Sequence, residues 1–149
     1  MRIAVASDHA GFPLKGKVVR FLSAKGHEVL DLGPFDATSV DYPDFAKEVA
    51  QRVSKGEVEV GVLICGTGVG MSIVANKFPG VRAALVNHVF TARQAKEHLD
   101  ANVLCLGGRV VGEGLAEAII EAWLEADFQG GRHARRVDKI RAIEGENFR

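Results

Sequence analysis

Five short apolar runs alternate with longer segments of helical periodicity, and this alternation restricts the fold more than any other feature of the sequence. The runs cover residues 3–7, 28–31, 60–64, 83–86 and 103–106. All but the second are nearly continuous in apolar residues, as expected of strands that are buried on both faces. The pattern predicts an α/β fold: a Rossmann-like, doubly wound sheet of five parallel strands with helices on both faces.

The segments between these runs place apolar residues on one helical face. The first segment is marked by Leu14, Val18, Phe21 and Leu22, and the second by Phe45, Val49 and Val53. Further helices are expected over residues 71–77, 91–98 and 115–124. A last helix, residues 132–144, follows two glycines and is too polar to pack on a sheet in the usual way. We therefore expect one domain over residues 1–149, in which the basic C-terminal segment 130–149 contacts a partner subunit.

Charge and composition exclude several classes of protein. The 149 residues include 19 Lys and Arg and 19 Asp and Glu, so the formal net charge is zero and neither a nucleic-acid nor a membrane partner is expected. The first apolar run reaches Asp8 too early for a signal peptide, and no later run approaches the roughly 18 residues of a spanning helix. Cys65 and Cys105, the only cysteines, form neither a disulfide framework nor a zinc-ligand spacing. We expect a reducing, cytoplasmic location.

The segment Cys65-Gly66-Thr67-Gly68-Val69-Gly70 follows the third predicted strand and is the most informative motif. Open parallel sheets bind ligands beyond the carboxyl ends of their strands, where loops and helix N-termini present free N–H groups. Alternate glycines let such donors approach an oxygen anion closely. The spacing does not fit a P-loop, a dinucleotide-binding turn or a phosphatase loop, because Met71 stands where these need lysine, glycine or arginine. A plain strand-to-helix turn is the alternative interpretation.

The candidate chemical groups lie at the ends of predicted elements. Cys65 precedes a helix N-terminus, which stabilises a thiolate for use as a base or nucleophile; a structural role in the core is the alternative. Cys105, inside a predicted strand, is interpreted as a core residue. Asp8 and His9 end the first strand, and His98 ends the fourth helix, where it otherwise serves as a helix-end cation. No metal is expected, because no His-Glu-x-x-His motif or carboxylate cluster occurs.

Arg132 and Arg136 are four residues apart and share one face of the last predicted helix. Two guanidinium groups at this spacing are suited to grip one phosphate. A solvated basic face is the alternative. Nucleic-acid binding is not supported, because aromatic residues make up only 7% of the chain and do not interleave with the arginines.

Seven motifs together carry a family resemblance. They are Ser7-Asp8-His9-Ala10-Gly11, Asp41-Tyr42-Pro43, Ile64-Cys65-Gly66-Thr67-Gly68-Val69-Gly70, Asn76-Lys77, Asn102-Val103-Leu104, Gly107-Gly108-Arg109 and Gly130-Gly131-Arg132-His133. In order and approximate separation they resemble type B ribose-5-phosphate isomerase, whose wider family includes galactose-6-phosphate and allose-6-phosphate isomerases. The resemblance implies an aldose–ketose isomerase acting on a sugar phosphate, without a cofactor. It also implies a homo-oligomer, a dimer or tetramer, whose active site is shared between two subunits.

The resemblance further implies roles for individual residues. Cys65 matches the base that moves a proton between C1 and C2 of the open-chain sugar, and Thr67 matches a residue at the sugar oxygens. Asp8 and His98 match positions linked to substrate handling and ring opening, and the loop N–H groups are implied to stabilise the enediolate. The implied substrate-binding residues are His9, Tyr42, Gly66, Gly68, Val69, Gly70, Arg109, Arg132, His133 and Arg136, with His9 and the two late arginines at phosphate-binding positions.

One position departs from the family pattern. Leu99 follows His98 where relatives commonly carry Asn, which leaves the preference for five- or six-carbon substrates open. Interconversion of D-ribose 5-phosphate and D-ribulose 5-phosphate through an enediolate is the main hypothesis. Isomerisation of allose or galactose 6-phosphate, and a non-catalytic sugar-phosphate sensor, are the alternatives.

Overall fold

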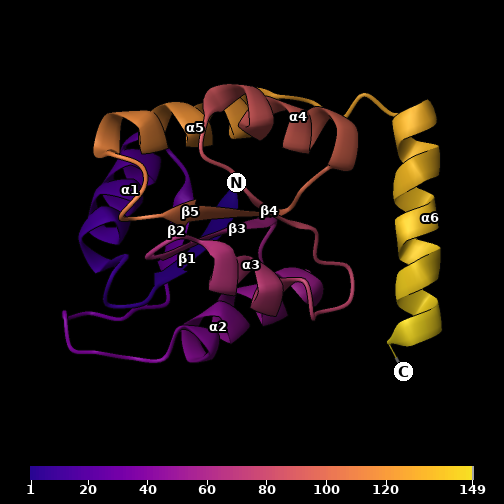
Figure 1. The fold of residues 1–149 in the computed structure, drawn as a ribbon. Coiled ribbons are helices and arrows are strands. Elements are labelled where there is room, and N and C mark those ends of the chain that lie inside the picture. The colour runs from indigo at the N-terminus through magenta and orange to yellow at the C-terminus, as the bar shows by residue number, and fades with distance from the viewer. Residues whose placement is uncertain (149) are drawn as a thin grey trace.

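The computed structural model describes residues 1–148 and contains one five-stranded sheet flanked by helices (Figure 1). The strands are β1 (Arg2–Ser7), β2 (Glu28–Asp31), β3 (Val60–Cys65), β4 (Ala83–Leu85) and β5 (Val103–Gly107). The helices are α1 (Phe12–Ala24), α2 (Tyr42–Ser54), α3 (Val69–Ala75), α4 (Val89–Leu99), α5 (Glu113–Glu125) and α6 (Arg132–Asn147). All strand pairs are parallel, in the order β2-β1-β3-β5-β4, which confirms the predicted α/β fold class.

Each face of the sheet packs against its own layer of helices. Successive side chains of a strand point to opposite faces, so Ile3 and Val5 of β1 lie in the cluster formed with α1, α4 and α5. Ala4 and Ala6 of the same strand lie in the cluster formed with α2 and α3. Trp123 of α5 is the largest fully buried side chain and closes the first cluster. The helices on both faces explain why the strands are nearly continuous in apolar residues.

Most element boundaries lie within a few residues of those expected, and α3 shows why the differences arise. It begins at Val69, two residues earlier than predicted, because Gly68 adopts a left-handed φ of 83° and starts the helix directly after the loop. It ends at Ala75, where the side-chain amide of Asn76 pairs with both backbone groups of Ala83 at 2.9 and 3.0 Å. The backbone conformation of Gly68 and the hydrogen bonds from Asn76 to Ala83, rather than apolar periodicity, therefore set the ends of this helix.

Helix α6 stands beside α4 and away from the sheet, at the yellow end of the chain in Figure 1. It buries only His133 and Val137, whereas Ile140 and Ile143 are exposed. The prediction that this helix is too polar for ordinary packing on the sheet is confirmed, and its contact with a partner subunit stays a prediction. None of the helices among residues 1–148 combines the length and the hydropathy needed to cross a membrane.

Candidate active site

Three loops meet at the carboxyl edge of the sheet, where β1, β3 and β5 end side by side. The register pairs Cys65 at the end of β3 with Gly107 at the end of β5. The backbone N–H of Asp8 donates to the carbonyl of Ile64 at 3.1 Å, and that of Gly108 donates to the carbonyl of Cys65 at 2.7 Å. These bonds join the loops after the three central strands, so the groups predicted at separate strand ends do lie at one edge.

The sulfur of Cys65 is held by the glycine loop. The backbone N–H of Gly68 donates to Cys65 Sγ at 3.1 Å. A side chain at position 68 would place Cβ 2.5 Å from Leu85 Cδ1 and 3.0 Å from the carbonyl oxygen of Leu106, and the positive φ disfavours any other residue. Glycine is thus required at position 68, and it aims one N–H at the sulfur.

The start of α3 supplies further donors. The first four N–H groups of a helix have no partner within that helix. The group of Gly68 binds the sulfur, and that of Val69 donates to Thr67 Oγ1 at 3.3 Å. Thr67 is exposed, whereas Met71 is fully buried and Gly70 lies against the ring of Tyr42. Thr67 and the N–H groups at the start of the helix therefore form a polar edge beside Cys65.

The two cysteines occupy different environments, although both are buried. Cys105 is fully buried in β5, and burial raises the pKa of its thiol, so it is unsuited to act as a base. Its interpretation as a core residue is confirmed. Cys65 is 5% exposed and lies beneath α2 and α3, deeper than its position at a loop suggests. It differs from Cys105 in receiving a backbone N–H on its sulfur.

Asp8 and His9, at the end of β1, are both oriented by backbone donors. Asp8 is buried, and its Oδ1 accepts from the N–H of Gly11 at 3.0 Å. His9 Nδ1 accepts from the N–H of Val40 at 3.2 Å, which leaves Nε2 to carry the proton of the neutral ring. The imidazole of His9 is therefore fixed with an N–H donor free for an anionic group.

Tyr42 and Arg109 lie against the two ends of the glycine loop. The exposed ring of Tyr42 covers Gly70 so closely that a Cβ there would come within 2.7 Å of the ring carbons. The guanidinium of Arg109 lies beside Gly66, where a Cβ would be 3.4 Å from its nitrogen. An aromatic ring thus covers one end of the loop and a positive charge lies at the other.

The remaining predicted residues form a second group, between α4 and α6. The rings of His98 and His133 are stacked, with centroids 4.0 Å apart and planes 8° from parallel. They line a cavity of about 490 Å³ with Arg136 and residues of β4 and α4. Its lining consists of Ala84, Leu85, Val86, Thr91, Gln94, Ala95, His98, Leu99, His133 and Arg136. Cys65, Thr67 and Asp8 are not part of this lining, so the described chain does not bring the two predicted groups into one cavity.

Electrostatics of the second group predict a pH dependence of stability. Burial, and then the charges of His98, Arg132 and Arg136, lower the pKa of His133 from its ordinary value of 6.5. The folded protein therefore keeps this ring neutral where the unfolded chain is already protonated. The resulting stability is complete above pH 6.5 and is lost as the pH falls below it.

We expect His133→Asn to reduce the loss of unfolding free energy between neutral and mildly acidic pH, measured by urea unfolding. An unchanged loss in the variant would contradict this assignment.

Some residues that shape the two groups have no individual signal in the sequence. Val40 orients His9 through its backbone N–H, which any residue other than proline supplies. Leu85 lies against Gly68 and also lines the cavity, so one side chain contacts both groups. Thr91 and Gln94 do have a signal, because their spacing to His98 places them on one face of α4.

A metal-binding arrangement is not found in the part of the chain that the structure describes. Within residues 1–148, no three or more His, Cys, Asp or Glu side chains gather in a way that could hold an ion. The strand-end group instead combines backbone N–H groups, the sulfur of Cys65, the hydroxyl of Thr67, the carboxylate of Asp8 and the imidazole of His9.

The fold and the strand-end group together define an α/β protein whose candidate site lies at the carboxyl edge of a doubly wound parallel sheet. A family model described as Ribose/Galactose Isomerase matches residues 3–140. The chain belongs to this family.

Relatives with known names and structures extend the match over nearly the whole chain. Ribose-5-phosphate isomerase B of Escherichia coli (strain K12) is 50% identical over 143 residues, 96% of each chain. A structure of ribose-5-phosphate isomerase B from Clostridium thermocellum has a TM-score of 0.96 and 53% identity, covering 98% of this chain and 99% of that chain. The enzyme from Mycoplasma genitalium, solved with bound ribulose-5-phosphate, has a TM-score of 0.93 and 49% identity over 98% of this chain and 97% of that chain.

Proposed function

We propose that this protein interconverts D-ribose 5-phosphate and D-ribulose 5-phosphate, with Cys65 as the base. The assignment of the reaction is supported by the family match and by relatives named for this activity across almost their full length. The observation that carries the mechanism is the hydrogen bond from the N–H of Gly68 to Cys65 Sγ within a loop of further donors. It gives the sulfur a defined direction and partner at the edge where parallel sheets bind ligands.

The reaction moves one proton between adjacent carbons. Cys65, as a thiolate, takes the proton from C2 of the open-chain aldose, and the carbonyl oxygen at C1 gains negative charge as the enediolate forms. Returning a proton to C1 and moving the hydroxyl proton completes the ketose. A positioned base contributes about 10²–10⁴-fold in rate, and one well-placed oxyanion donor about 3 kcal/mol. Because electrons stay within the sugar, the step needs no nicotinamide and no other redox cofactor.

The polar edge beside the sulfur is assigned to the sugar oxygens. Thr67 and the N–H groups from Gly66 to Gly70 lie next to Cys65 and are suited to a developing oxyanion. Asp8 is assigned to the handling of the sugar hydroxyls, because it is buried at the same edge with one carboxylate oxygen bound to a backbone N–H. Tyr42 and Arg109, at the two ends of the loop, are assigned to substrate binding.

The phosphate and the ring-opening step are assigned to residues of two chains. His9 offers an imidazole N–H at the strand-end edge. Arg132 and Arg136, on one face of α6, are suited to grip the phosphate, with His133 beside them. His98, half-buried in the cavity, is assigned to opening the sugar ring.

A shared site in a homo-oligomer is supported by the separation of the two groups. The cavity that His98 lines in one chain does not include Cys65, so a second copy is proposed to bring its α4 and α6 to the strand-end edge of the first. The exposed Ile140 and Ile143 of α6 are suited to a contact between copies. Two free, buried cysteines fit a reducing compartment, and we place the reaction in the cytoplasm.

Isomerisation of a six-carbon sugar phosphate is the second candidate, and Leu99 is the reason to keep it. This side chain is 43% exposed, follows His98 and lines the cavity, so an apolar group stands where relatives offer an amide. A six-carbon sugar phosphate is one carbon longer than a pentose phosphate, so it would place a different part of the sugar beside Leu99.

One assay tests the activity, the substrate and metal independence together. Purified protein is given ribose 5-phosphate, allose 6-phosphate and galactose 6-phosphate, each with a chelator present. We expect ketose formation with the highest kcat/KM for ribose 5-phosphate. A higher kcat/KM for a six-carbon substrate would replace the substrate assignment. Binding of ribose 5-phosphate with neither turnover nor exchange of its C2 proton with solvent would indicate a sensor.

A further inference from the structure

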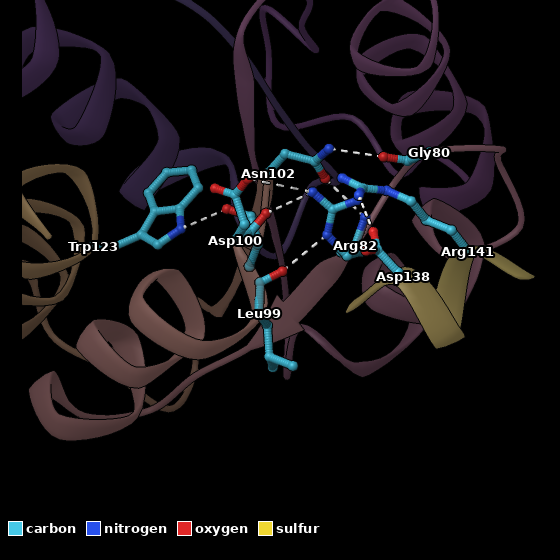
Figure 2. A network of polar contacts seen from close by, with 9 residues as sticks. Gly80, Arg82, Leu99, Asp100, Asn102, Trp123, Asp138 and Arg141 are labelled. Atoms are coloured by element: carbon cyan, nitrogen blue, oxygen red, sulfur yellow. Dashed lines mark hydrogen bonds and ion pairs between the residues drawn. The ribbon is translucent and has the colours of Figure 1, made fainter. Parts of the chain in front are cut away.

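The end of α4, directly after His98, is held by a residue outside both predicted groups. Figure 2 shows Arg82 reaching from the segment before β4 to the last carbonyls of this helix. Arg82 Nε donates to the carbonyl of Leu99 at 2.9 Å, and its terminal NH2 donates to the carbonyl of Asp100, also at 2.9 Å. Asp100 has a left-handed φ of 48°, the one positive φ of a non-glycine residue in the described chain. Arg82 thus fixes the point at which the chain leaves the helix.

Arg82 is itself locked to neighbouring backbone. The backbone N–H of Arg82 donates to Asn102 Oδ1 at 2.8 Å, and Asn102 Nδ2 donates to the carbonyl of Gly80 at 2.8 Å. The N–H of Gly80 donates in turn to Glu144 Oε1 of α6 at 2.7 Å. A continuous chain of hydrogen bonds therefore runs from the end of α4 through Arg82 to the far part of α6 (Figure 2 shows all of it except Glu144).

The start of α6 is attached to α4 separately. The N–H of Gln129 donates to the carbonyl of Glu97 at 2.9 Å, one residue before His98. The stacked pair of His98 and His133 lies close to this attachment. Two attachments, one near each end of α6, set the distance and angle between the two helices. Of these, only the chain through Arg82 acts directly on the carbonyls that follow His98.

We propose that Arg82 is a positioning residue, which holds the imidazole of His98 in its stack with His133 by fixing the end of α4 against α6. The proposal rests on the proposed function for its kinetic consequence, since His98 is assigned there to ring opening. Arginine is suited to this role because its planar fork bonds two carbonyls at once, which a lysine ammonium on a flexible stem does not do in a fixed geometry. The side chain of Arg82 is only 15% exposed, so most of it is held within the fold.

The test compares Arg82→Gln and Arg82→Lys with Arg141→Gln. Arg141 is the matched control, because it bonds Asp138 within α6 at 3.0 Å and does not touch the end of α4 (Figure 2). Two readouts are used on each folded variant: the imidazole C–H resonances of His98, which ring stacking shifts, and kcat and KM for ribose 5-phosphate. A residue with a purely structural role lowers the melting temperature but leaves both readouts of the folded protein unchanged.

We expect Arg82→Gln to move the His98 resonances towards their unstacked positions and to lower kcat/KM by about 10- to 100-fold, mainly through kcat. Arg82→Lys is expected to fall between this variant and the wild type, and Arg141→Gln to match the wild type. Wild-type resonances, or wild-type kcat/KM, in folded Arg82→Gln would overturn the proposal. If Arg82→Gln does not fold, wild-type values of both readouts in Arg82→Lys overturn it. Wild-type protein without isomerase activity would refute the proposed function, and the His98 resonances alone would then decide the positioning role.

Discussion

Cys65→Ala is expected to lower kcat for ribose 5-phosphate by about 10²–10⁴-fold, the usual contribution of a positioned base. The substitution removes the sulfur that receives the N–H of Gly68 and leaves the loop backbone in place. KM is therefore expected to change little, because the groups assigned to the phosphate lie elsewhere. Turnover is measured in both directions, together with exchange of the C2 proton with solvent deuterium.

Cys105→Ala is the matched control for this prediction. It removes the same atoms from a fully buried position in the neighbouring strand β5. We expect a loss of about 1 kcal/mol in unfolding free energy, from the small cavity left behind, and unchanged kcat. Equal kcat in Cys65→Ala and in the wild type would show that another group removes the proton.

Mixing two inactive variants is expected to restore activity if the site is shared. Cys65→Ala chains retain His98, and His98→Gln chains retain Cys65, so a mixed dimer contains one site with both groups intact. Random pairing makes half of the dimers mixed, and about a quarter of the wild-type activity is expected to return. The variants are mixed in equal amounts, unfolded and refolded together, and then assayed.

The same experiment distinguishes a site contained within one chain. In that case every site of the mixture carries one of the two substitutions, and activity stays at the level of the separate variants. Sedimentation of each variant before mixing checks that both form the oligomer. Full activity in a monomer of the wild type would also contradict the shared site.

The sheet was predictable from the sequence because its strands are buried on both faces. An apolar run such as residues 103–106 has few alternatives when helical segments flank it, and the alternating side chains of β1 fill both clusters. The limits of α3 were less predictable, since they depend on the φ of Gly68 and on Asn76 pairing with Ala83 across the fold. Such contacts are not visible in local periodicity.

The strand-end group was predictable because the topology brings the carboxyl ends of β1, β3 and β5 to one edge. Asp8 directly follows β1 and Cys65 is the last residue of β3, so their proximity comes from the order of the strands. The stacking of His98 on His133 could not be predicted, because it depends on the angle between α4 and α6, which β5 and α5 separate in the chain. The positioning role proposed for Arg82 could not be predicted either, because its guanidinium bonds backbone carbonyls, which every residue carries.

A crystal structure of the protein with bound ribulose 5-phosphate tests the central claim most directly. We expect Cys65 Sγ within about 3.5 Å of C1 or C2 of the sugar, the separation of a near-attack geometry. We also expect the phosphate between His9 of one chain and the Arg132 and Arg136 pair of a second copy. A sugar whose reacting carbons are shielded from Sγ by packed side chains, with a different basic group facing them, would contradict the account.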